Sequence, residues 1–320
     1  MKHRERAIIA LTGGTPDYVP TFELVFDETE RDFQGRAWIG GPAEPDTIGM
    51  SYKDKIKYNA RLYVDVAERF NYSIIFICRT LGKHENKKES GVVDTIKEIR
   101  EISGDEYLIM THNDPTFMIP FTNMEQFCYD LIDRPKRMHK IAKKNLEESK
   151  KKCHQLLKAG ADGFIMCCDY CFNSGCFVSP AQFEEFIFPY LKEAIAYFKS
   201  QGAYVIKHTD GNIMPVINYL VESEPHALHS LDPMAGVDIK EVKEKYGNRI
   251  ALCGNVDCSL MQTGTKEQIR ESAEYCLKYA KPNGGYIFST SNCVFRGMPL
   301  ESYDLIYSIW MEKREYKTVR

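Results

Sequence analysis

The sequence lacks any apolar run of the ~18 residues that a membrane-spanning helix needs. Its basic start, MKHRERAIIALTGG, contains only the apolar run IIAL, which is too short for the core of a secretory signal peptide. We therefore expect a cytoplasmic protein that does not associate with membranes. In that compartment its 11 cysteines are expected to be reduced thiols that pack in the core or bind metal.

The chain also lacks an excess of positive charge. Its 42 basic and 45 acidic side chains give a net charge of −3, and no basic patch is interleaved with aromatic residues. Nucleic acid is therefore not an expected partner. Hydrophobic residues at 43% and charged residues at 27% are typical of an ordinary globular chain.

Eight short apolar runs alternate with helical patterns along the chain. Strands separated by helices predict parallel βα units, and eight units predict an α/β fold, namely a single-domain (β/α)8 TIM barrel over residues 1–320. A doubly wound open sheet is the alternative, but no G-x-G-x-x-G motif follows the first run. The irregular stretch at about 25–50 is expected to form a long loop or lid at the barrel mouth. The runs are VPTFEL (19–24), SIIFIC (73–78), EYLIMTH (106–112), GFIMCCD (163–169), AYVIKH (203–208), ALHSLD (227–232), IALCGN (250–255) and GYIFST (285–290).

Two helical patterns carry their own start signals. Residues 181–200 place apolar side chains at the three-four spacing of one buried face, and a capping box of Ser179 and Gln182 precedes them. Pro189 lies inside this pattern and should kink the helix, because it cannot donate a backbone hydrogen bond. Residues 266–281 repeat the pattern after a threonine cap.

Polar side chains gather where the predicted strands end. In a barrel these carboxyl ends form the active-site mouth, although any one such residue can simply mark where a strand meets solvent. Side chains alternate along a strand, so His208 and Asp210 should point to the same side if the strand continues to Asp210. By the same rule His226 and His229, three residues apart, should not share one metal ion. The strand-end set is Glu23, Cys78, His112, Asp114, Asp169, His208, Asp210, Asp232, Asn255, Asp257, Asn292 and Cys293.

Four cysteines lie close together in the segment CCDYCFNSGC, residues 167–176. The spacing Cys168-x-x-Cys171 has no second C-x-x-C motif elsewhere, which argues against a structural zinc site. An iron–sulfur cluster with Cys176 as a third ligand remains an alternative. Burial as small apolar residues is the interpretation for Cys167, Cys253 and Cys276.

Cys293 differs from the other cysteines because it follows the last predicted strand. It should therefore reach the barrel mouth, where it can meet His208. A third ligand from Asp210, Glu23 or Asp169, together with one open position, would complete a catalytic zinc site.

Long blocks of the sequence resemble the uroporphyrinogen decarboxylase superfamily. They run from SPAQFEEFIFPYLKEAIAYFKSQGAYVIKHTDGN through SLDPMAGVDIKEVKEKYGNRIALCGNVD to GGYIFSTSNCVFRGMPLESYD. The opening RERAIIALTGGTPDYVP is similar to the usual N-terminus of that superfamily. The resemblance covers nearly the whole chain and implies the (β/α)8 fold, in agreement with the count of apolar runs.

Within this superfamily the chain is more similar to the cobamide-dependent methyltransferases than to authentic uroporphyrinogen decarboxylase. The decarboxylase carries an arginine-rich block after its first strand, which grips the substrate's carboxylates. Here the equivalent stretch is TFELVFDETERDF, with acids in place of those arginines. The methyltransferases bind zinc through H-x-C and a second cysteine. In this sequence KHTDG supplies His208, with Asp210 in the cysteine position, and SNCVF supplies Cys293.

The resemblance implies a zinc ion (Zn2+) held by His208, Asp210 and Cys293, since zinc accepts carboxylate oxygen as well as sulfur. It also implies that a methyl group moves between a small methylated compound, of the methoxy or methylthio/thiol type, and a corrinoid on a partner protein. Members of the superfamily are often dimers, so a homodimer is expected. The residues expected to orient the substrate or move protons are Asp169, His112 and Glu23.

Two other functions remain open at the level of sequence. A metal-independent decarboxylase or other lyase of the same family would use Asp169 and His208 as polar groups. A barrel of this kind could instead bind a corrinoid or tetrapyrrole without turnover. Metal content separates the methyltransferase from the lyase, and turnover separates it from the binding protein.

Overall fold

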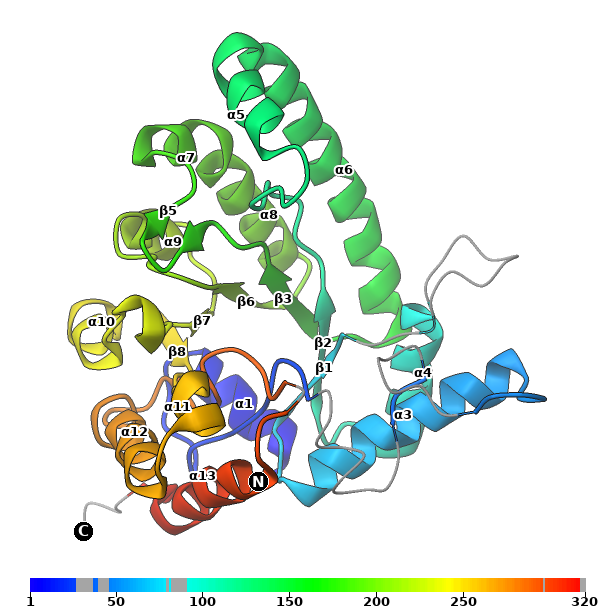
Figure 1. The fold of residues 1–320 in the computed structure, drawn as a ribbon. Helices are drawn as coiled ribbons and strands as arrows, with labels where there is room; N and C mark the ends of the chain where they lie inside the picture. Colours follow the sequence, from blue (N-terminus) through cyan, green and yellow to red (C-terminus); the bar gives the residue numbers. More distant parts are fainter. Residues whose placement is uncertain (27–36, 40–45, 79–80, 82–90, 296, 317–320) are drawn as a thin grey trace.

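A curved sheet of seven parallel strands forms the centre of the computed structural model, which describes residues 1–26, 37–39, 46–78, 81, 91–295 and 297–316 (Figure 1). Neighbouring strands pair in parallel throughout, as the alternation of strands and helices predicts. A small antiparallel hairpin, β4 (Cys171–Phe172) and β5 (Gly175–Cys176), follows β3. In spatial order the sheet consists of β1 (Ile74–Ile77), β2 (Leu108–His112), β3 (Gly163–Cys167), β6 (Tyr204–Thr209), β7 (Ala227–Ser230), β8 (Ala251–Cys253) and β9 (Tyr286–Ile287).

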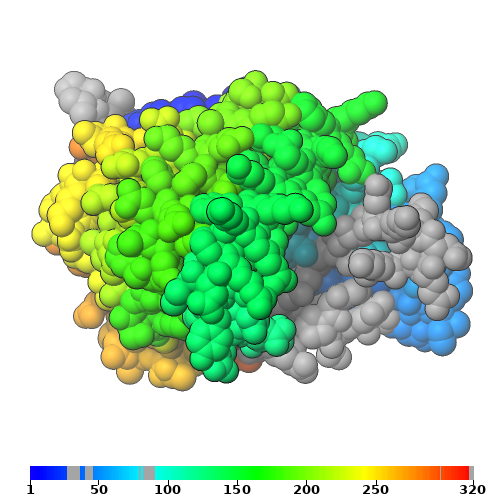
Figure 2. Space-filling model, turned by 90° about the horizontal axis from the view of Figure 1, so that it is seen from above, coloured from blue at the N-terminus to red at the C-terminus, as the bar shows by residue number. Residues whose placement is uncertain are grey.

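Helices connect the strands and pack around the sheet (Figure 1). The pair α5 and α6 projects beyond the sheet, and the segments that contain α5 to α8 cover much of the face seen from above (Figure 2). No described helix is both long and apolar enough to cross a membrane. The helices are α1 (His3–Leu11), α3 (Tyr52–Arg69), α4 (Val92–Ser103), α5 (Met124–Asp133), α6 (Pro135–Ala159), α7 (Pro180–Phe186), α8 (Phe188–Ser200), α9 (Ile217–Glu222), η1 (Pro233–Ala235), α10 (Ile239–Tyr246), α11 (Cys258–Thr263), α12 (Lys266–Tyr279) and α13 (Leu300–Lys313).

The predicted first strand, residues 19–24, is an irregular segment rather than a named strand. It lies between the two edges of the sheet: Phe288 N donates to Pro20 O over 2.9 Å, and Ser73 N donates to Thr21 O over 2.8 Å. The described sheet therefore has seven strands instead of the eight predicted. The reason is that this segment forms one parallel bridge, from Thr21 to Phe288 just after β9, and a hydrogen bond with Ser73 just before β1, without a continuous ladder.

Alternating side chains of the strands divide the core into two layers. On β1, Ile75 and Ile77 belong to the large cluster between sheet and helices, whereas Ile74 and Phe76 belong to the cluster inside the curve. The inner cluster also contains apolar residues of α1, so this helix packs against the inner side of the sheet. Ile206 of β6 belongs to the same inner cluster, which places His208, two residues later, on the inner side.

The helix predicted over residues 181–200 is two helices, α7 and α8, with a break at Ile187. Pro189 lies in the first turn of α8, where its missing N–H leaves no intrahelical hydrogen bond unmade. The capping box of Ser179 and Gln182 is confirmed at the start of α7. The second predicted helix is also confirmed, as α12 with its threonine cap.

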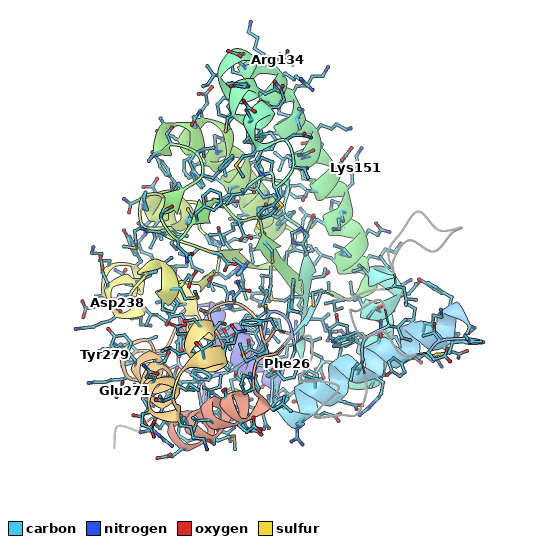
Figure 3. All side chains as sticks on the ribbon, viewed as in Figure 1. Phe26, Arg134, Lys151, Asp238, Glu271 and Tyr279 are labelled. Carbon is cyan, nitrogen blue, oxygen red and sulfur yellow. The ribbon has the colours of Figure 1, made fainter. Side chains whose placement is uncertain are left out.

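The predicted loop or lid at about 25–50 falls largely on residues 27–36 and 40–45, which lie outside the described residues. The short piece between them is buried against α3. There Trp38 Nε1 donates to Phe26 O over 3.3 Å, and the Trp38 ring lies 4.2 Å from that of Tyr63. Phe26, labelled in Figure 3, also places its ring 5.0 Å from that of Tyr303 in α13.

Candidate metal centre

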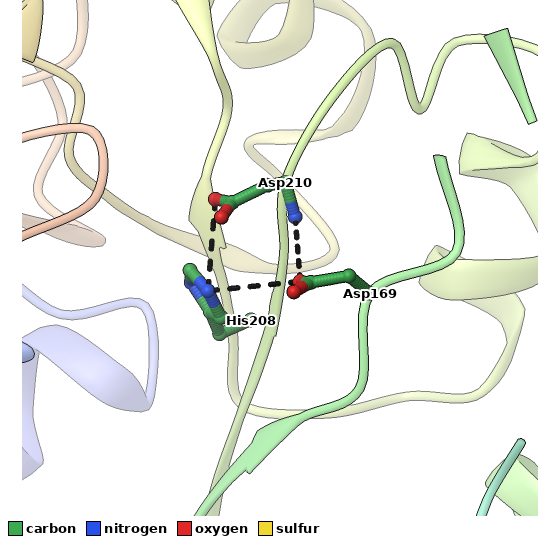
Figure 4. Close-up of side chains that lie close together, drawn as sticks. All are labelled: Asp169, His208 and Asp210. Carbon is green, nitrogen blue, oxygen red and sulfur yellow. Dashed lines mark hydrogen bonds and ion pairs between the residues drawn. The ribbon is translucent and has the colours of Figure 1, made fainter. Parts of the chain in front are cut away.

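Three side chains at the ends of neighbouring strands converge on one point. His208 lies in β6, Asp210 directly follows that strand, and Asp169 lies two residues after β3. The register pairs Cys167 with His208, so both aspartates extend beyond the sheet on adjacent chain segments. His208 Nε2 lies 3.6 Å from Asp210 Oδ1 and 3.9 Å from Asp169 Oδ1 (Figure 4). The prediction that His208 and Asp210 point to the same side is confirmed.

A second histidine fixes the ring of His208. The Nδ1 atoms of His208 and His229 lie 2.7 Å apart, and His229 Nε2 lies 3.2 Å from Ser289 Oγ. The Ser289 hydroxyl donates to Thr290 O, so it accepts the hydrogen of His229 Nε2. His229 therefore accepts a hydrogen bond at Nδ1 from His208. This arrangement leaves the Nε2 lone pair of a neutral His208 directed at the two aspartates.

Within the described part of the chain, one carboxylate oxygen of Asp210 accepts no hydrogen bond. Asn292 Nδ2 donates to Asp210 Oδ2 over 2.6 Å, whereas Asp210 Oδ1 is buried and has no hydrogen-bond partner among the described residues. A buried, unpaired carboxylate oxygen is unfavourable, and a bound cation would satisfy it. Burial, and to a smaller extent the charges of Asp210 and Asp257, raises the pKa of the neighbouring Asp232.

The spacing of these atoms fits a zinc ion. In a tetrahedral site with zinc–ligand distances of ~2.0–2.2 Å, neighbouring ligand atoms lie roughly 3.3–3.6 Å apart. The ligand atoms of His208, Asp169 and Asp210 all lie within 4.8 Å of one another, and the two distances from His208 Nε2 are 3.6 and 3.9 Å. Across the described ranges of the chain, no other trio of His, Cys, Asp or Glu meets this spacing. Imidazole nitrogen and carboxylate oxygen are both ligands that zinc accepts.

The backbone around Asp169 is held from two directions. Asp210 N donates to Asp169 Oδ1 over 3.1 Å, and Ile119 N donates to Asp169 O over 2.9 Å. The next amide, Tyr170 N, donates to Oγ1 of Thr209 at the end of β6. These hydrogen bonds fix the Asp169 carboxylate relative to His208.

A buried ion pair joins β6 to the segment that follows β2, on the opposite face of the sheet from His208. Lys207 Nζ lies 2.8 Å from Asp114 Oδ2, and both side chains are fully buried. Lys207 also donates to Met166 O and Cys168 O, and Asp114 accepts from Cys168 N. Burial opposes the charge of Asp114, but Lys207 and the hydrogen bonds outweigh it and lower the pKa of this carboxyl to about 2. The pair therefore fixes the ends of β3 and β6 next to the candidate metal centre.

The other predicted site residues lie outside this group. Glu23 is buried and accepts from Thr290 Oγ1 over 2.6 Å; burial raises the pKa of Glu23 to about 8. His112 is exposed at the end of β2, and Cys293 is half-buried. None of the three belongs to the group around His208. Their roles as ligand or proton-transfer groups stay predictions.

Sequence patterns give no role in this site to His229 or Lys207, and they place Asn292 at the mouth without naming a partner for it. His229 is excluded from sharing a metal with His226, and His226 Nδ1 indeed accepts from Val205 N instead. The signal for His229 is its strand position, because the register of β6 and β7 pairs it directly with His208. Asn292 and Lys207 each lie next to a predicted ligand in the sequence, but their partners come from distant segments.

The sulfur atoms of the cysteine-rich segment, residues 167–176, do not converge on one point. Cys168 Sγ donates to Thr116 O, while the sulfur atoms of Cys171 and Cys176 lie 3.1 Å from each other. In the described part of the chain, no trio of closely spaced ligand atoms includes these cysteines. The iron–sulfur alternative therefore has no support from this geometry. The predicted burial of Cys253 and Cys276 is confirmed, whereas Cys167 is only half-buried.

Known proteins resemble the chain in sequence pattern and in structure. The model of the uroporphyrinogen decarboxylase (URO-D) family matches residues 83–309. A methyltransferase from Methanosarcina mazei superposes with a TM-score of 0.77 over 98% of this chain and 99% of that chain, at 17% identity, and this likeness shows a shared fold. A sugar phosphate isomerase/epimerase from Parabacteroides distasonis gives a TM-score of 0.45 at 11% identity, over 91% of this chain and 95% of that chain. No curated protein matches the sequence.

Proposed function

The chain belongs to the uroporphyrinogen decarboxylase family, and we propose that it is a corrinoid-linked methyltransferase of that family. It moves a methyl group between a small compound of the methoxy or methylthio/thiol type and a corrinoid carried by a partner protein. The fold shared with a methyltransferase supports this branch of the family. In the same proposal, residues 20–22 occupy the position of an eighth strand and close the sheet into a single-domain barrel.

One observation carries the proposal. His208 Nε2 and Asp210 Oδ1 lie 3.6 Å apart, and the latter atom is buried without a hydrogen-bond partner among the described residues. In a purely structural polar network, a buried carboxylate oxygen normally accepts a hydrogen bond. An oxygen left unpaired beside an imidazole nitrogen suits a cation-binding site.

We assign the zinc ligands to His208, Asp210 and a third residue. The geometry favours Asp169 as the third ligand, and the family resemblance favours Cys293. A zinc ion bound there would act as a Lewis acid that polarises the oxygen or sulfur atom of the methyl donor or acceptor.

The protein's own side chains orient this site and can hold protons. His229 keeps the His208 ring in place through the 2.7 Å contact between their Nδ1 atoms. Asn292 holds Asp210 Oδ2, which leaves Oδ1 facing His208. The Asp169 side chain is 28% exposed, so a substrate can reach it for orientation or proton transfer. Glu23, with a pKa of about 8, is protonated near neutral pH and could act as a proton donor.

The first test measures the metal content of the full chain. The protein is purified without oxygen, and its metal is quantified by elemental mass spectrometry. We expect about one zinc ion per chain after zinc is supplied and excess is removed, with loss in His208→Ala. His226→Ala is the matched control, because His226 lies at the opposite end of β7 and bonds only to backbone in the described structure. Absence of metal from the wild-type chain would overturn the zinc assignment.

The second test is methyl transfer itself. Zinc-loaded protein is mixed with methylcobalamin and a thiol, or with reduced cobalamin and a methoxyarene, and the cobalamin spectrum is followed. We expect demethylation or methylation of cobalamin that requires His208. A spectral change on binding without turnover would instead identify a corrinoid-binding barrel.

A metal-free lyase is the second candidate function. The observation that favours it is that His208 lies within 4 Å of two carboxylates, an arrangement that also suits a protonated imidazole acting as an acid. Metal-free wild-type protein that decarboxylates a carboxylated substrate, with activity lost in His208→Ala, would establish this function in place of methyl transfer.

A further inference from the structure

Two cysteines face each other on the short hairpin that follows the candidate metal centre. Cys171 of β4 pairs directly with Cys176 of β5 in the antiparallel register, and their sulfur atoms lie 3.1 Å apart. The proposed methyl transfer uses neither thiol. The cysteine-rich motif is therefore not explained by the proposed function.

The backbone of this pair suits a disulfide bond. Directly opposed residues of antiparallel strands have Cα atoms about 4.5–5.5 Å apart. Disulfides usually join residues whose Cα atoms are ~4.4–6.8 Å apart. Bond formation would therefore need only a small approach of the two sulfur atoms and no rearrangement of the hairpin.

One of the two thiols can be reached from solvent. Cys171 is buried, whereas Cys176 is half-buried, and Phe172 at the turn of the hairpin is 42% exposed. Cys168, the other nearby cysteine, is buried and donates to Thr116 O on a different side. Cys176 is therefore the thiol that an external reagent meets first, and Cys171 is the thiol placed to react next.

The hairpin is bonded to the segment that carries Asp210. Asn212 N donates to Phe172 O over 2.9 Å. A Cβ atom on Gly211 would lie 2.5 Å from Cys171 O, so the two backbones are in direct contact. The hairpin also begins two residues after Asp169. A disulfide bond formed in the hairpin would therefore lie next to the segments that carry Asp169 and Asp210.

We propose that Cys171 and Cys176 form a reversible dithiol–disulfide modification site, oxidised by small-molecule disulfides such as glutathione disulfide. The Cys176 thiolate attacks one sulfur of the small disulfide, forms a mixed disulfide and releases one thiol. The Cys171 thiolate then attacks Cys176 Sγ of the mixed disulfide, which forms the Cys171–Cys176 bond and releases the second thiol. The two cysteines lose two electrons and two protons, and the small disulfide gains both as two thiols.

The test is thiol mapping of the full-length chain. Reduced protein is incubated with glutathione disulfide without oxygen, alkylated and cleaved with chymotrypsin, since Tyr170 and Phe172 offer cleavage sites that separate the neighbouring cysteines. We expect a peptide pair joined through Cys171 and Cys176, lost again on treatment with dithiothreitol. Failure of the two cysteines to join, or joining of Cys176 to another cysteine such as Cys168, would overturn the proposal.

Variants resolve the order of the steps. Cys171→Ser should accumulate a glutathione adduct on Cys176, because the resolving thiol is gone. Cys128→Ser, which changes a half-buried cysteine of α5, is the matched control and should form the bond like the wild-type chain. An adduct on Cys176 in the wild-type chain that persists as long as in Cys171→Ser would contradict the proposal. None of these outcomes depends on metal binding or methyl transfer.

Discussion

The rings of His208 and His229 meet through their Nδ1 atoms at 2.7 Å, in the interior of the curved sheet. Only one of two facing nitrogens can carry the hydrogen, and the Ser289 contact on the far side of His229 assigns it to His208. Burial is the main cause that lowers the pKa of His229 well below its ordinary value, so that ring stays neutral. The pair therefore controls which nitrogen of His208 faces Asp169 and Asp210.

His229→Phe keeps a ring of similar shape but removes the acceptor for His208. We expect zinc affinity to fall by about 10–100-fold, as for other partners that orient a metal-binding histidine. Competition against a chromogenic chelator measures this change. The same substitution at His226 is the control. Equal zinc affinities for His229→Phe and the wild-type chain would show that His229 does not orient His208.

The third metal ligand can be identified with cobalt(II) in place of zinc. We expect Asp169→Ala to weaken cobalt binding much more than Cys293→Ala, because Asp169 Oδ1 lies 3.9 Å from His208 Nε2. A bound thiolate gives cobalt(II) an intense near-ultraviolet band that carboxylate ligands do not give. If that band is present in the wild-type protein and disappears in Cys293→Ala, Cys293 is the ligand instead.

The stability of the protein should fall when one partner of the buried pair Lys207 and Asp114 is removed. Lys207→Met leaves an unpaired buried carboxylate, and we expect it to lower the free energy of unfolding by about 3–5 kcal/mol, measured by urea denaturation. The double variant Lys207→Met/Asp114→Leu should recover much of that loss, because no buried charge remains. Lys245→Met, which breaks an exposed pair with Glu241, is the control and should change stability little. A Lys207→Met variant as stable as this control would contradict the prediction.

Glu23 should give the protein a defined dependence of stability on pH. Burial raises the pKa of Glu23 from 4.5 to about 8, so between these values the unfolded chain releases a proton that the folded chain keeps. The Glu23 contribution to stability is therefore full below about pH 4.5 and is lost as the pH rises towards 8, by at most about 1.4 kcal/mol per pH unit.

Glu23→Gln replaces the protonated acid with a neutral amide and removes this dependence. The stability of the variant relative to the wild-type chain should therefore increase between pH 5 and pH 8, as measured by denaturation at each pH. A constant difference across this range would show that Glu23 does not titrate with a raised pKa.

Local patterns in the sequence determined the elements of the fold and part of the site. The capping boxes at Ser179 and Thr265 start helices because each side chain bonds the backbone three residues on. Alternation of side chains in extended backbone, from β6 to the residue that follows it, places His208 and Asp210 on one side for an equally local reason. These features depend on neighbours in the chain, so one sequence is enough to predict them.

The tertiary structure decided how the site is completed. Asn292 lies 82 residues from Asp210 in the chain, and Asp114 lies 93 residues from Lys207. Such pairs follow from the way the strands are arranged around the curved sheet, because neither pair joins two neighbouring strands. One-dimensional patterns do not encode that arrangement. Hydrophobic periodicity fixes which face of a strand is buried, but pairing with a particular residue of the next strand depends on packing of the whole sheet. For this reason the sequence predicts which side chains reach the site, and only the folded chain shows which of them meet.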